Sequence, residues 1–220
     1  MWVDRNFVLA VIWLIEAALP IFSLAGSSAR DNLELVLLAE PDIKHGAALF
    51  DTCAACHGPT GAGAPDGSVP VIAGQHFKVI VRQLVDYQRG KRSDERMEHF
   101  ANTHHLRDAQ EVADVAAYVN ALSPSYDAVV GSGESLLQGS QVFLRVCASC
   151  HGRSAVGDSV RAIPRLAGQH YDYLLRQMND VIERRRPDYS PAHLVLFGRL
   201  DRAELKEVAD YLARMGAAVH

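Results

Sequence analysis

The stretch CAACH at residues 53–57 and the related stretch CASCH at residues 147–151 decide the fold. In each, two thiols three positions apart are followed at once by a histidine, and C-x-x-C-H is the haem c attachment pattern. The thiols can form thioethers to the two vinyl groups of one macrocycle, and the histidine can reach its iron. The sequence therefore predicts two covalently bound haem c groups, attached through Cys53, Cys56, Cys147 and Cys150 and ligated by His57 and His151.

Other uses of paired cysteines compete with this interpretation. Disulfides are common in exported chains, and a redox dithiol also has two spaced thiols. Zinc sites use C-x-x-C as well, but zinc needs two more ligands in each half, for which His76 and His170 are the candidates. Those histidines follow a Gly-Gln pair at a predicted helix start. They are more simply explained as surface residues, or as residues that support a metal ligand, than as zinc ligands. The haem pattern consumes every cysteine, so no thiol remains as a nucleophile.

The chain contains an internal repeat. A shift of 94 residues places the second motif on the first, and it also carries AGQH at 73–76 onto AGQH at 167–170. Two copies of one module explain this self-similarity. Serine, proline and glycine between the copies are typical of a linker. We predict a first domain over 38–123, a linker over 124–133 and a second domain over 134–220.

Each module has a helical pattern. Apolar spacing predicts one helix before the cysteines, one in the middle, and a last one with Asp108 or Asp201 as its N-cap. No alternating strand pattern of useful length is present, so the predicted fold class is all-α. The predicted helices cover 41–51, 76–89 and 109–122 in the first half, and 134–145, 170–185 and 202–215 in the second.

Size and charge limit what the modules can do. Domains of about 80–90 residues bury little apolar surface, so the macrocycle would serve as most of each core. The net charge of −4 and the lack of a basic block give no support for nucleic-acid binding, so we expect no nucleic-acid partner. Basic runs at 89–92 and 184–186 follow the middle helices, and we expect solvated helix ends there, because cations suit helix C-termini. Contact with an acidic partner or with haem propionates is the alternative.

Longer stretches around the motifs carry a family resemblance. Residues 46–58 (GAALFDTCAACHG) and 139–152 (GSQVFLRVCASCHG), with PVIAGQ at 70–75 and PRLAGQ at 164–169, resemble class I cytochrome c domains. Two such domains in tandem resemble the cytochrome c4 family over about residues 38–220. The resemblance implies two small helical shells around covalent haems. It also implies that Pro70 and Pro164 pack against the proximal histidines and accept their imidazole N–H, which orients each ligand.

The family pattern asks for a methionine on the loop before the last helix. In the first half Met97 lies in a polar loop at the matching place, so it is the expected sixth ligand of the first haem. A core gap-filling role is the alternative. The neighbouring His99, His104 and His105 are competing ligands.

The second half departs from that pattern. Met178 lies in the middle of a predicted helix and is expected to be a core residue. Met215 is too far along the last helix to be the ligand. His193 occupies the place of Met97, allowing two residues of slack in the loop, and is therefore the expected sixth ligand. An open five-coordinate iron, or another histidine, is the alternative.

The pattern of the N-terminal residues predicts that the protein is exported. Residues 7–25 are mostly apolar, follow the basic Arg5, and are succeeded by small residues that suit cleavage. Glu16 and Pro20 interrupt the run and count against a membrane-spanning helix. We predict that residues 1–29 are a signal peptide, with an uncleaved anchor and membrane association as the alternative. Export agrees with the resemblance, since haem c is attached on the outer side of the membrane.

The resemblance implies a function. It predicts a periplasmic electron carrier, not an enzyme, between a quinol-oxidising complex or dehydrogenase and a terminal oxidase or reductase. One alternative is a haem enzyme or sensor with an open second iron. The other is a cytochrome subunit of a membrane dehydrogenase or oxidase.

Overall fold

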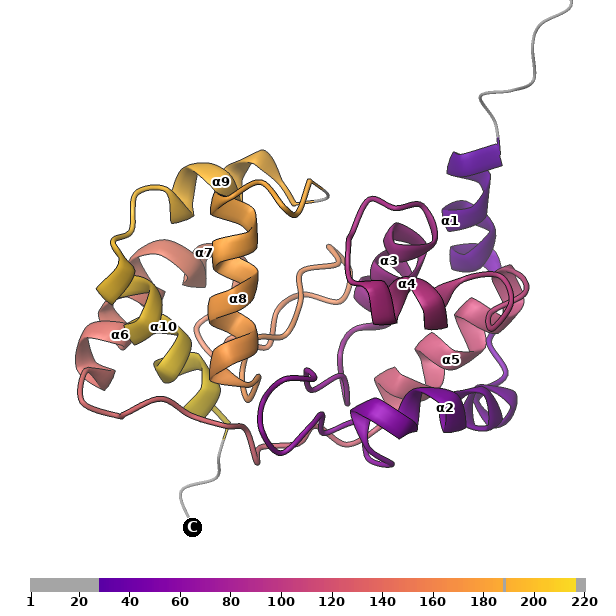
Figure 1. Cartoon of the computed structure of the whole chain (residues 1–220), viewed down its shortest axis with the longest axis horizontal. Coiled ribbons are helices and arrows are strands. Elements are labelled where there is room, and N and C mark those ends of the chain that lie inside the picture. The colour runs from indigo at the N-terminus through magenta and orange to yellow at the C-terminus, as the bar shows by residue number, and fades with distance from the viewer. Residues whose placement is uncertain (1–27, 188, 217–220) are drawn as a thin grey trace, which may run out of the picture.

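The structure, a computed structural model, describes residues 28–187 and 189–216. In these residues it is helical, and the only β-type pairing is one isolated bridge between Asp158 and Ile163. Two groups of helices lie side by side, as Figure 1 shows. The predicted all-α fold of two tandem modules is therefore confirmed. The predicted signal peptide lies almost wholly outside the described residues.

The helices follow one order in both modules. The first module contains α1 (Ser28–Leu38), α2 (Ile43–His57), α3 (Phe77–Gln88), α4 (Glu95–Ala101) and α5 (Ala109–Ala121). The second contains α6 (Leu136–Val142), the π-helical turn η2 (Phe143–Cys147), α7 (Ala148–His151), α8 (Tyr171–Ile182), α9 (Pro191–Phe197) and α10 (Arg202–Arg214). None of these helices combines the length and apolar character that a membrane crossing needs.

The first helix of each module runs further than predicted. The expected end near residue 51 is wrong, because α2 continues through the attachment motif to Gly58. Gly58 and Gly152 have φ angles of 74° and 75°, which glycine adopts without strain and which end the helix directly after the histidine. Each motif is thus held on helical backbone. The predicted N-caps are confirmed, since Asp108 accepts from Glu111 N–H and Asp201 forms a capping box with Glu204.

The π-helical turn η2 explains a one-residue irregularity in the repeat. Three positions separate Phe50 from Cys53, whereas four separate Phe143 from Cys147. A π-helical turn accommodates one additional residue inside an α-helix. The second motif therefore keeps its place relative to the haem site although its helix is one residue longer.

Glycines allow the first and last helices of each module to cross closely. A Cβ on Gly46 would lie 2.1 Å from the backbone oxygen of Asp114, and one on Gly139 would lie 2.1 Å from that of Glu207. Next to each crossing an aromatic pair packs, Phe50 on Tyr118 and Phe143 on Tyr211, with ring centres 5.2 and 5.8 Å apart. The crossing fixes the direction in which each attachment motif points.

Helix α1 was not predicted as part of the fold. It packs against α3 and α5, and its Val36 is fully buried in the core of the first module. The apolar packing of that module therefore begins before residue 38.

The two modules meet through a nearly two-fold set of hydrogen bonds. The Gln75 amide accepts from Arg165 N–H (2.9 Å) and donates to Arg165 C=O (3.0 Å). Gln169, 94 positions further along, makes the same pair of bonds to Val71 (2.9 and 2.8 Å). Such self-matching contacts are typical of isologous interfaces. The repeated Ala-Gly-Gln segment thus serves the contact between modules.

The histidines after these glutamines belong to the same interface. His76 Nε2 donates to Val156 C=O at 2.7 Å, and His170 Nε2 donates to Ala62 C=O at 3.1 Å. His170 is 2% exposed, so a surface position is wrong for it. Both histidines therefore have hydrogen-bond partners in the opposite module.

Candidate metal centres

A large cavity lies beside the first attachment motif and extends to the second module. Its volume is about 420 Å³, which is the size of a cofactor site. Cys53, Cys56 and His57 line one side, and Met97 also lines it. Much of the remaining wall is apolar, with Ile72, Ile80, Leu84, Phe100, Leu106, Val115 and Val119 among its residues. A macrocycle attached at the cysteines would fill this space and complete the core.

The proximal histidines are held by the prolines that the resemblance pointed to. His57 Nδ1 lies 3.0 Å from Pro70 O, and His151 Nδ1 lies 3.0 Å from Pro164 O. A carbonyl oxygen only accepts, so Nδ1 carries the proton and the lone pair is on Nε2. Burial lowers the pKa of both histidines, which favours the neutral form. Each imidazole is therefore prepared to bind a metal through Nε2.

The environment of the cysteines disfavours the competing interpretations. Burial raises the pKa of Cys53 and of Cys147 to about 11, whereas reactive dithiols have depressed values. No group of three or more His, Cys, Asp or Glu side chains within 28–187 and 189–216 could hold a metal ion. A zinc site made from side chains alone is absent from that part of the chain. The donor set, one imidazole beside two thiols and an apolar cavity, fits a covalent haem.

Met97 lies on a short helix, whereas the sequence suggested a polar loop. Asp94 caps α4 by accepting from the N–H groups of Arg96 and Met97. This cap fixes the start of the helix and presents Met97 to the cavity that His57 also lines. The competing histidines, His99, His104 and His105, are not among the residues that line it.

In the second module two histidines lie close together. The ring centres of His151 and His193 are 6.2 Å apart, with planes inclined by 67°. Metal–imidazole bonds are about 2 Å long, so one metal ion between two imidazoles places their centres about 6 Å apart. His193 lies on helix α9, again in place of a predicted loop, between Tyr189 and Phe197.

His193 also has unused bonding capacity. Its Nδ1 is buried and has no hydrogen-bond partner, which is rare for a polar group and calls for a ligand or another explanation. Burial, followed by the nearby His151, lowers the pKa of His193 and favours the neutral imidazole. Met178, by contrast, is buried in the core of the second module, as predicted.

Sequence reasoning missed several residues around these sites. Gln75, Gln169, His76 and His170 join the modules, and only their repetition under the 94-residue shift could have indicated a shared role. Arg92 and Arg186, from the basic runs, are buried. The expectation of solvated helix ends is wrong for these two.

Comparison with known proteins agrees with this geometry. The family model for cytochrome c matches residues 43–123 and again residues 136–216. The chain is therefore a c-type cytochrome of two domains, and it carries two covalently bound haem c groups.

Individual relatives narrow the family. Cytochrome c4 of Pseudomonas aeruginosa is 29% identical over 182 residues, covering 79% of this chain and 89% of the relative. The thiosulfate dehydrogenase electron acceptor of Stutzerimonas stutzeri is 32% identical, covering 74% and 79%. The crystal structure of reduced recombinant cytochrome c4 from Pseudomonas stutzeri has the same fold, with a TM-score of 0.71, 24% identity and coverage of 80% and 100%. The chain belongs to the cytochrome c4 family of dihaem electron-transfer cytochromes.

Proposed function

We propose that this chain is an exported, periplasmic carrier of single electrons in which both irons are six-coordinate. His57 and Met97 hold the first iron, and His151 and His193 hold the second. The observation that carries the proposal is the 6.2 Å separation of the imidazoles of His151 and His193. If these four residues hold the irons, no ligand position would be left for a substrate, so the chain would act as a carrier and not as an enzyme.

The residues around each iron prepare it for fast exchange of electrons. Each haem, when bound, stores one electron on its iron. The prolyl carbonyls of residues 70 and 164 hold the proximal rings in place through the 3.0 Å bonds, which raises ligand basicity. The apolar wall of the cavity beside the first motif would limit solvent rearrangement when the charge changes.

Unequal distal ligands give the two centres different potentials. Methionine opposite histidine raises the potential of a haem iron, so Met97 makes the first centre the more oxidising one and His193 makes the second the more reducing one. Electrons then pass preferentially from the second module to the first.

The partners are other redox proteins. A quinol-oxidising complex or a dehydrogenase supplies the electron, and a terminal oxidase or reductase receives it. One relative is named as the electron acceptor of thiosulfate dehydrogenase, which supports a dehydrogenase as donor. The proposal excludes nucleic acid as a partner.

Carbon monoxide binding tests the carrier role directly. The reduced mature holoprotein should bind carbon monoxide slowly and incompletely at neutral pH, because a six-coordinate iron must first lose a ligand. Low-temperature EPR of the oxidised protein should give one histidine–methionine and one bis-histidine signal. Rapid, stoichiometric binding at one haem with a five-coordinate signal would instead assign an enzyme or sensor. Recovery of the mature protein with residues 1–29 retained in the membrane fraction would favour the membrane-subunit alternative.

A further inference from the structure

Two arginines at corresponding places in the two modules are buried at the module junction. Arg92 is 4% exposed and Arg186 is 9% exposed, and they are 94 positions apart. Both line the cavity that also contains His57. Arg184 and Arg185, beside Arg186 in the sequence, are exposed. The burial of Arg92 therefore needs an explanation beyond a favourable helix end.

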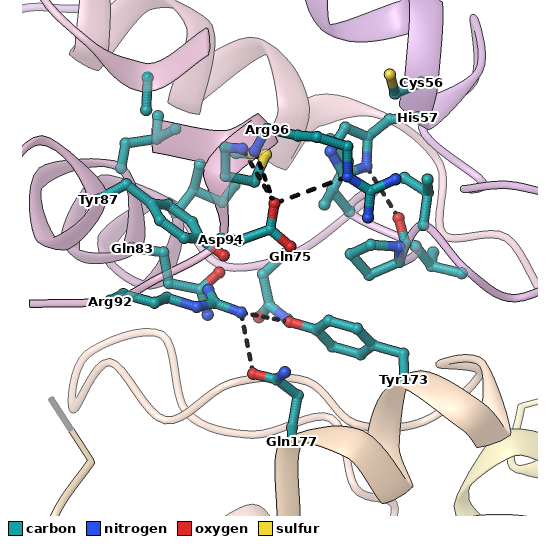
Figure 2. A pocket seen from close by; sticks show the side chains of 18 of the residues that line it. Cys56, His57, Gln75, Gln83, Tyr87, Arg92, Asp94, Arg96, Tyr173 and Gln177 are labelled. Atoms are coloured by element: carbon teal, nitrogen blue, oxygen red, sulfur yellow. Dashed lines mark hydrogen bonds and ion pairs between the residues drawn. The ribbon is translucent and has the colours of Figure 1, made fainter. Parts of the chain in front are cut away.

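The contacts of Arg92 reach into the opposite module and are all neutral. Its Nη2 donates to the Tyr173 hydroxyl at 2.7 Å and to Gln177 Oε1 at 3.1 Å. Both bonds are drawn in Figure 2. Its guanidinium lies 4.7 Å from the centre of the Tyr87 ring. No carboxylate of the described residues forms an ion pair with Arg92. Burial of a cation without an anion is costly, and buried charges are as a rule paired.

The second arginine converges on the same acceptor. Arg186 Nη1 donates to Gln177 Oε1 at 2.5 Å, so two guanidinium groups share one neutral amide oxygen. Like charges brought this close repel. Asp94, on the wall of this cavity, is already engaged as the cap of α4 and as partner of Arg96. An anion for Arg92 would therefore come from something that enters the cavity.

We propose that Arg92, supported by Tyr173 and Gln177, binds a propionate carboxylate of the first haem across the module junction. The haem attached at Cys53 and Cys56 would occupy this cavity, which both cysteines line, and it carries carboxylates of the required charge. A guanidinium binds a carboxylate more strongly than a neutral acceptor does. Because Arg92 is positioned by residues of the second module, docking of the two modules sets the charge around the first haem.

The proposal predicts a shift in reduction potential. A cation close to the haem favours the reduced iron, so its removal lowers the midpoint potential. In the R92Q holoprotein the equilibrium constant for one-electron reduction of the first haem should fall about tenfold. This corresponds to a midpoint potential that is lower by about 59 mV. R92K should retain most of the potential because it keeps the charge. R82Q is the matched control, since exposed Arg82 donates to Ala162 C=O across the same junction at 3.0 Å without lining the cavity.

Spectroelectrochemical titration measures both midpoints in each variant, and haem content is checked by the mass of the protein. R92Q with two haems and an unchanged first midpoint would overturn the proposal. So would an equal shift in R82Q, because the effect would then come from loosened docking. If the midpoint potential of the first haem in the wild type changes with phosphate concentration at constant ionic strength, Arg92 binds a free anion and not the propionate.

A second measurement covers the case in which R92Q does not mature. Redox-induced infrared difference spectra of the holoprotein, with ¹³C in the haem propionates, identify the propionate bands directly. Y173F leaves the arginine in place but removes the hydroxyl that positions it. We expect the labelled carboxylate stretch to shift in Y173F and in R92K but not in R82Q. Identical labelled bands in wild type, Y173F and R92K would contradict the assignment.

Discussion

The imidazole of His193 lies close to that of His151, with ring centres 6.2 Å apart and planes inclined by 67°. In the first module the proposed counterpart of His193 is Met97, which lines the cavity beside His57. In the proposed assignment the two sites therefore share a motif histidine and differ in the second ligand. This difference gives the proposed carrier its direction.

The first prediction concerns the two midpoint potentials. Imidazole donates more strongly to iron than a thioether does, so the haem between His151 and His193 should titrate at the lower potential. A difference on the order of 0.2 V would bias the equilibrium between the centres by about three powers of ten, at 59 mV for each tenfold change. Redox titration of the holoprotein measures both values. A higher midpoint for the second haem would refute the ligand assignment and the direction of flow together.

Exchange of the distal ligands tests each assignment separately. H193M should give the second haem methionine-type absorbance and raise its midpoint, because a thioether replaces the imidazole. M97H should do the opposite at the first haem. M178L is the control, because Met178 is buried in the core and should leave both spectra unchanged. If the H193M spectrum equals that of the wild type, His193 is not a ligand.

The parts of this fold that depend on short-range chemistry could be predicted from the sequence. The attachment motifs and the caps at Asp108 and Asp201 act over a few residues, and the structure contains both caps. The prolines, 13 residues from their histidines, were indicated by the family resemblance, and both prolyl hydrogen bonds are present. Helix ends were less accurate. The first helix was predicted to end near residue 51, yet α2 continues through the haem motif until Gly58.

Features that depend on how the modules dock could not be predicted. Arg92 and His170 have the composition of surface residues, and they are buried only because another module covers them. No local pattern states which faces of two similar units meet. The repeat of residues 73–76 was visible, but repetition alone does not distinguish a haem contact from an interface contact.

The helix crossing at Gly139 should be intolerant of a side chain. In G139A the new Cβ would lie 2.1 Å from Glu207 O, so α6 and α10 must separate. Overpacking of this kind costs about 1–3 kcal/mol of unfolding free energy, even though alanine favours a helix over glycine. Denaturant unfolding of the holoprotein, followed by circular dichroism, measures the loss. Q141A, at an exposed position of the same helix, should change stability by less than about 0.5 kcal/mol.

A pH dependence is expected at His45, near the start of α2. The hydrogen bond from its Nδ1 to Asp114, at 2.8 Å, raises the pKa of His45 above its ordinary value. A raised pKa in the folded state stabilises the protein below the unfolded value of 6.5, and this contribution is lost as the pH rises through the folded value. The difference in unfolding free energy between wild type and H45Q should therefore be larger at pH 5.5 than at pH 9. A difference that is constant with pH would mean that the pair is not ionic.

The two pairs of glutamine hydrogen bonds across the junction should respond independently to mutation, as measured by amide hydrogen exchange. In Q75A the Arg165 N–H loses its 2.9 Å partner, while Val71 N–H keeps its bond to Gln169. Loss of one such bond costs about 1 kcal/mol or more, so we expect the Arg165 amide to exchange about tenfold faster. Q169A should reverse the pattern, with Val71 fast and Arg165 protected, and each variant is thus the control of the other. Equal acceleration at both amides in either variant would mean that the interface opens as one unit, and unchanged protection would mean that these bonds do not hold the modules together.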